Sequence, residues 1–166
     1  MAKATLYSKG CPCSCDRRIE AKPCTDCCPI SLGTKSFSEE HGYDECPKVD
    51  EPCGGDETAS CSGRTIGPIN LRSDPFPTEC LKNLKPVAAV SLSADNFGMA
   101  SGESGQVGCP PSNACTICGA SGTVTPFVES AGNGKSRLRI TAKGQNSVHG
   151  GPYSLFVTAT FSLQPI

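Results

Sequence analysis

Thiols are the residues of this chain whose number and spacing could do chemistry, because 13 cysteines occur among 166 residues. A cysteine thiolate can bind zinc, and a pair of thiols can oxidise to a disulfide. Most of the cysteines fall within the first 65 residues, where they form three groups: Cys11, Cys13 and Cys15, then Cys24, Cys27 and Cys28, then Cys46, Cys53 and Cys61.

Zinc and disulfides compete as interpretations of the first two groups. A tetrahedral zinc site would take four thiolates, and Cys11, Cys13, Cys24 and Cys27 are the candidate ligands. The crowded CPCSC triplet and the adjacent pair ending at Cys28 favour disulfides, because neighbouring cysteines usually have to point to separate parts of a fold. We expect disulfides and no resident cofactor, with zinc as the open alternative. Since 13 is odd, one thiol stays free or bonds outside the chain.

No arrangement of residues predicts catalysis. Two CxxC pairs occur, Cys24–Cys27 and Cys115–Cys118. A thioredoxin-type redox site would place such a pair at the start of a helix in a βαβ unit, and neither pair has that setting. His41 and His149 both precede glycine in turn-like sequence, and nothing places a nucleophile beside either of them. Residues 134–136 (GKS) resemble the end of a phosphate-binding loop, but Glu129 stands where its first glycine should be. We therefore predict a hairpin turn there, no catalytic residue, and a protein that is not an enzyme.

Composition restricts the remaining classes of function. Apolar residues make up 37% and aromatic residues 5% of the chain, so the hydrophobic core must be small. A formal net charge of -1 argues against a nucleic-acid groove, and no apolar stretch approaches a membrane span. The first 20 residues lack the apolar region of a secretory signal. Either the thiols bind metal in the cytoplasm, or the protein oxidises later, for example in a virus particle released by lysis.

Three segments are expected along the chain. Residues 1–65 read as an extended, cysteine-rich arm, which is too poor in apolar residues to stay ordered unless something clamps it. Residues 66–86 read as a proline-rich connector with a short helical turn near residues 78–84, which Thr78 could cap. Cys80 could tie this connector to the arm, or pair with the group Cys109, Cys115 and Cys118. Residues 87–166 read as an antiparallel β-domain.

Residues 153–163 (YSLFVTATFSL) carry the clearest pattern, the alternation of a half-buried β-strand. Only Phe156 breaks it, so Phe156 is expected to lie under the arm or against a neighbouring subunit. Further strands are predicted at 87–92, 123–129 and 137–143, with a Gly/Ser-rich loop after the first and a turn at 131–134. The fold class is mainly β: a small antiparallel sandwich or partial barrel with a long, irregular, cysteine-rich N-terminal arm.

An arm without a core of its own is usually held by burial against a partner, so the chain reads as an assembly subunit. In outline, residues 87–166 with the arm resemble the small decoration, or cement, proteins of tailed-bacteriophage capsids. That resemblance implies a structural virion protein that binds the major capsid protein or other virion subunits, as a homo-oligomer such as a trimer. A tail or neck component of a virion is the first alternative. A cytoplasmic adaptor stabilised by zinc is the second.

Overall fold

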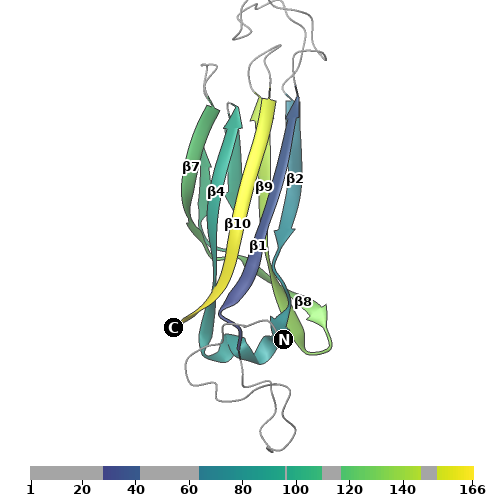
Figure 1. Ribbon diagram of the computed structural model, residues 1–166, viewed down its shortest axis with the longest axis vertical. Coiled ribbons are helices and arrows are strands. Elements are labelled where there is room, and N and C mark those ends of the chain that lie inside the picture. The colour runs from purple at the N-terminus through teal and green to yellow at the C-terminus, as the bar shows by residue number, and fades with distance from the viewer. Residues whose placement is uncertain (1–27, 42–63, 96, 110–116, 147–152) are drawn as a thin grey trace, which may run out of the picture.

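The computed structural model describes residues 28–41, 64–95, 97–109, 117–146 and 153–166 of the chain. These residues form two antiparallel sheets of long strands, packed face to face (Figure 1). The expected mainly β, sandwich-like fold is therefore confirmed. The first sheet has the order β1 (Ser31–His41), β10 (Tyr153–Pro165), β4 (Leu84–Asp95), β7 (Ile117–Val124). The second has the order β2 (Arg64–Arg72), β9 (Lys135–Asn146), β5 (Phe97–Ser101), β6 (Gln106–Cys109).

Two short strands extend the second sheet along β9. β3 (Phe76–Pro77) continues the line of β2 on one edge of β9, and β8 (Phe127–Gly132) continues the line of β5 on the other edge. Arg139 of β9 consequently faces Arg72 across one edge and Phe127 across the other. β9 is the central strand of its sheet for this reason.

β10 has the same central place in the first sheet, between β1 and β4 (Figure 1). It is the strand that the alternating sequence predicted. Its inward side chains include Leu155, Ala159, Phe161 and Leu163, each with no exposed surface. They face the inward side chains of the second sheet, among them Leu138 and Ile140 of β9, and together these residues make one continuous core.

The expected boundaries of the β-domain were wrong at its N-terminal side. Residues 31–41 fall in the predicted arm, yet they form β1, which pairs along its length with β10. The sequence concealed this strand because only Leu32 and Phe37 supply large apolar side chains to the core. Hydrogen bonding to β10 orders β1 in place of apolar content. Residues 1–27 and 42–63 of the predicted arm lie outside the described residues.

Two further segments hold strands that were expected to be irregular. The predicted connector contains β2, β3 and the 3-10 helix η3 (Thr78–Lys82). That helix confirms the predicted helical turn, but its N-cap is Pro77 and no side chain caps it, so the capping role expected of Thr78 is wrong. The predicted Gly/Ser-rich loop contains β5 and β6. Gly108 of β6 lies against neighbouring backbone, since a Cβ there would come within 2.6 Å of the Gly98 carbonyl oxygen.

The strand predicted at 123–129 is in fact two strands in different sheets. β7 ends at Val124 in the first sheet, and β8 begins at Phe127 in the second. The buried Pro126 lies at this corner, where its missing N–H removes it from any ladder. Thr125 exchanges both backbone hydrogen bonds with Ser104, which fixes the crossing.

The turn expected at 131–134 is present and joins β8 to β9. Gly132, Asn133 and Gly134 all have positive φ, the backbone conformation that glycine and asparagine adopt most easily. Residues 134–136 therefore belong to a β-hairpin, as predicted, and are followed by a strand, whereas a phosphate-binding loop would be followed by a helix.

A disulfide between Cys28 and Cys80, which are 52 positions apart in sequence, joins the segment before β1 to η3. Both side chains are buried in the core. The bond confirms that Cys80 ties the predicted connector to the predicted arm. The alternative pairing of Cys80 with the group at 109–118 is thereby wrong.

We expect loss of this disulfide to lower the free energy of unfolding by about 2–4 kcal/mol, because the unfolded chain regains the entropy of an open loop. Cys28→Ala, Cys80→Ala and the double variant should lose nearly the same amount, since each removes the same bond. Urea unfolding of the three variants and the parent chain measures this. Additive losses would show that the two cysteines act separately.

The two phenylalanines of β10 provide a matched pair that tests which face of the strand is buried. Phe161→Ala should lower the free energy of unfolding by about 3–5 kcal/mol, because it leaves a cavity in the core. Phe156→Ala should change it by about 0.5 kcal/mol or less, because that ring lies on the outer surface. Thermal and urea unfolding of both variants would contradict the strand orientation if the order were reversed.

Candidate interaction surfaces

The candidate site residues expected from the sequence fall mostly outside the described part of the chain. Cys11, Cys13, Cys24 and Cys27, the proposed zinc ligands, are among residues 1–27, and His149 lies between β9 and β10, also outside it. His41 ends β1. Within the described ranges, no three or more histidine, cysteine, aspartate or glutamate side chains lie close enough together to bind a metal ion.

The outer surface of the first sheet carries small, uncharged side chains. Residues directly opposite one another in an antiparallel sheet share a face, so the cross-strand partners of Thr158 and its neighbours define this surface. We call it the hydroxyl face, and it consists of Thr34, Ser36, Ser38, Ala89, Ser91, Ser93, Gly119, Ser121, Thr123, Phe156, Thr158 and Thr160.

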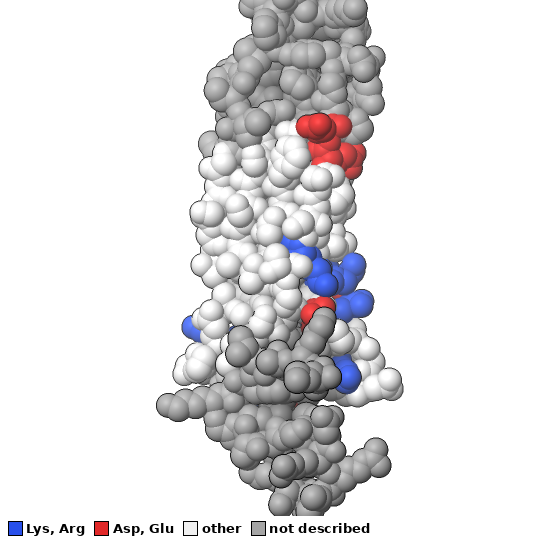
Figure 2. Space-filling view, in the orientation of Figure 1, with Lys and Arg blue, Asp and Glu red and all other residues white. Residues whose placement is uncertain are grey.

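Hydroxyl groups on the hydroxyl face bond to one another across strands. Thr34 and Thr160 lie 3.0 Å apart between their side-chain oxygens, and Ser36 and Thr158 lie 3.3 Å apart. Figure 2 shows no charged atoms over most of this face; most acidic and basic side chains lie toward the β1 side, and a basic side chain is also visible at the lower left. Phe156, which is 37% exposed, is the one aromatic residue of the face and lies between Ser38 and Ser93.

The outer surface of the second sheet is different, because four charged side chains converge there. Glu129 of β8 accepts hydrogen bonds from Nε of Arg72 (2.6 Å), Arg137 (2.9 Å) and Arg139 (3.2 Å). We call these four residues the arginine cluster. Three positive charges surround one negative charge, so the cluster has a net positive charge.

Arg139 is the most firmly held member of the arginine cluster. Its Nη1 also donates to Asn70 Oδ1 at 3.1 Å and to Thr141 Oγ1 at 2.7 Å. Its guanidinium lies over the ring of Phe127, 4.5 Å from the ring centre. Arg139 therefore joins β2, β8 and β9 and serves to hold the sheet together.

The arginines also determine the protonation of Glu129. Partial burial raises the pKa of Glu129, but hydrogen bonds from Arg72 and Arg137 and their positive charges outweigh burial, so the pKa lies below its ordinary value. The carboxylate thus stays ionised and keeps both guanidinium groups in place.

The sequence predicted the strand at 137–143 that contains Arg137 and Arg139, but not the arginine cluster. The contact between Glu129 and Arg137 could have been predicted, because a turn at Asn133–Gly134 puts these two residues opposite each other in the hairpin. Arg72 could not be found in this way, because it is 57 residues from Glu129 and reaches it only through the pairing of β2 with β9.

The arginine cluster should make stability depend on pH. Since the pKa of Glu129 is lowered by folding, its contribution is complete above the carboxyl's ordinary value of 4.5 and is lost as the pH falls through the folded-state pKa. Glu129→Gln should lower the free energy of unfolding at pH 7 by about 0.5–1 kcal/mol. It should also flatten the curve of stability against pH in the acid range. Glu79→Gln, at an exposed residue of η3, is the control, and its curve of stability against pH should be measured in the same way. Equal slopes for the two variants would contradict the role given to Glu129.

Comparisons with known proteins give no relative for this chain. No family model matches it, and neither do curated proteins or solved structures. No helix among the described residues is long and apolar enough to cross a membrane. The two outer surfaces and the Cys28–Cys80 bond are the features of the molecule that bear on its function.

Proposed function

We propose that the protein is a structural component of a virus particle, a capsid decoration or cement protein that binds capsid subunits through its hydroxyl face and has no catalytic role. The observation that carries the proposal is the hydroxyl face itself, a broad sheet surface whose charged neighbours stand only at its borders.

An uncharged surface is inexpensive to cover with another protein. Charged groups would have to lose water on burial, whereas serine and threonine hydroxyls rotate to meet donors or acceptors on a partner. Depletion of charge is the feature that separates the centre of an interface from ordinary surface. Phe156 offers an aromatic anchor within this area, of the kind that often contributes most of the binding energy.

The fold suits a component that must persist outside a cell. A disulfide fastens β1 to the body of the sandwich, and such bonds are typical of proteins that function in oxidising surroundings. This favours the virion over the cytoplasmic zinc adaptor as the setting for the chain. The major capsid protein is the proposed partner, with homo-oligomers, such as trimers, bridging neighbouring capsid subunits.

A charge placed in the hydroxyl face should weaken attachment to the particle. Virus particles assembled without this protein would be mixed with the recombinant protein. The amount of protein that sediments with the particles would then be measured. Thr158→Arg and Ser91→Arg should lower the affinity by about tenfold or more, since a charge would be buried at the interface.

Gln145→Arg is the matched control, because Gln145 is exposed on β9, in the other sheet. It should bind as the parent protein does, and circular dichroism should show all variants folded. Failure of the parent protein to sediment with particles would refute the virion role. Undiminished binding of both arginine variants of the hydroxyl face would refute that face as the contact.

A further inference from the structure

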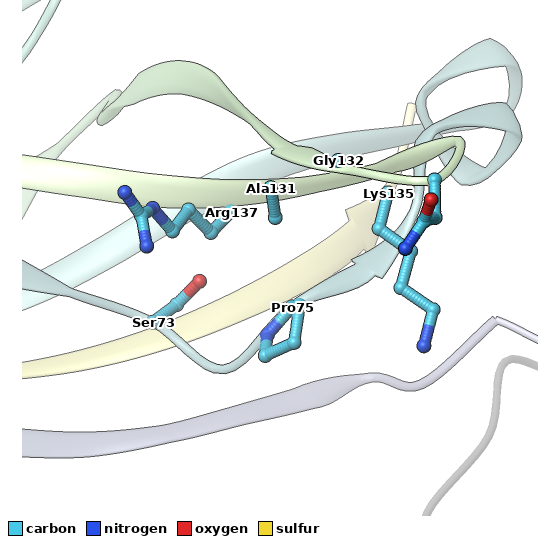
Figure 3. A pocket seen from close by; sticks show the side chains of 7 residues that line it. Ser73, Pro75, Ala131, Gly132, Lys135 and Arg137 are labelled. Carbon is cyan, nitrogen blue, oxygen red and sulfur yellow. The ribbon is translucent and has the colours of Figure 1, made fainter.

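A shallow depression of about 400 Å³ lies between the loop after β2 and the β8–β9 hairpin. Arg137 and Lys135 line it from β9, Ser73 and Pro75 from the loop, and Ala131 from the hairpin. Figure 3 shows the guanidinium of Arg137 at one end and the side chain of Lys135 at the other, with Pro75 and Ala131 between them. Two cations thus stand at opposite ends of a depression of mixed lining, which also includes Gly132 and Asn133.

Arg137 also belongs to the arginine cluster, which brings a second guanidinium close to this end of the depression. Arg72 and Arg137 both donate through Nε to the same oxygen of Glu129, so their guanidinium groups are neighbours. Among the hydrogen bonds of the described residues, Arg72 and Arg137 donate through Nε and not through their terminal amino groups, Nη1 and Nη2. Their side chains are 42% and 41% exposed, which leaves those donors accessible to a ligand.

Glu129 leaves the site positively charged while holding it in shape. One carboxylate against Arg72 and Arg137 neutralises only part of their charge, and Lys135 has no carboxylate partner among the described ion pairs. Paired guanidinium groups whose orientation is fixed beforehand lose little entropy when they bind an oxyanion.

We propose that this depression binds a phosphorylated sugar. The terminal amino groups of Arg137 and Arg72 would hold the phosphate oxygens by charge-assisted hydrogen bonds. Pro75 and Ala131 would lie under the sugar ring, and Lys135 would meet hydroxyl or anionic oxygens at its far side. The volume lies within the range of small-molecule sites.

The arrangement favours a small ester over a nucleic acid. Nucleic-acid binding draws its affinity from neutralising many phosphates in succession, whereas the free donors here converge on one end of a short depression. The proposal is independent of the hydroxyl face, which lies on the other sheet, so attachment to a particle and binding of a phosphate ester can fail separately.

Isothermal titration of the full chain with glucose 6-phosphate, inorganic phosphate and glucose tests the proposal. We expect saturable binding of glucose 6-phosphate in the millimolar range or tighter, weaker binding of inorganic phosphate, and none of glucose. Arg137→Gln should weaken binding of the ester at least tenfold. Lys85→Gln, an equal loss of charge on the other sheet, should leave it unchanged.

Lys135→Gln covers the case in which Arg137→Gln disturbs the fold, because Lys135 forms no described ion pair. It should weaken binding of glucose 6-phosphate several-fold while the melting temperature stays that of the parent. No saturable binding of the ester would overturn the proposal. So would equal affinities for the ester and inorganic phosphate, or equal losses in Lys85→Gln and Lys135→Gln.

Discussion

Burial of one face of β10, and of that face only, is the constraint on which the sandwich depends. Leu155, Val157, Ala159, Phe161 and Leu163 turn into the core, and a shift of one residue in the pairing of this strand would expose all of them to water. Because β10 pairs with both β1 and β4, that register is imposed on its neighbours. The same alternation turns threonine and serine outward, so the core and the hydroxyl face have a single origin.

β1 shows how a strand with few apolar residues can be kept in place. Among the strands that the structure describes, it has β10 on one side and none on the other, which makes it the edge of this sheet. Lys35, on the inward side of β1, forms an ion pair with Asp74 at 3.2 Å, and this charge discourages a further strand from pairing there. The Cys28–Cys80 bond holds the start of the same segment against η3.

The two outer surfaces differ because the two central strands differ in their outward residues. β10 presents Thr158 and Thr160, whereas β9 presents Arg137, Arg139 and Lys143. One surface can be covered by another protein without burying charge. The other carries its charges on long side chains that Glu129 arranges into a network. Both surfaces lie outside the core, but the arginine cluster also links the strands of its sheet.

Local sequence patterns predicted those elements that interactions between neighbouring residues determine. Alternation over 153–163 predicted β10, and Asn133–Gly134 predicted the hairpin, because side-chain period and turn geometry are properties of neighbouring residues. The class of fold followed from these elements together with the other strands predicted from the sequence. Phe156 was also recognised as the residue on the wrong side of its strand.

Only the tertiary structure decided what depends on pairing between distant segments. β1 was hidden because it is ordered by the ladder with β10, more than 100 residues away, and not by its own apolar content. Pro126 was compatible with an edge strand or a bulge, and only the place of β8 beside β9 shows that it lies at a corner between the two sheets. Arg72 meets Glu129, and Cys28 meets Cys80, only after both sheets have formed, because spacing along the chain does not fix distances across a sandwich.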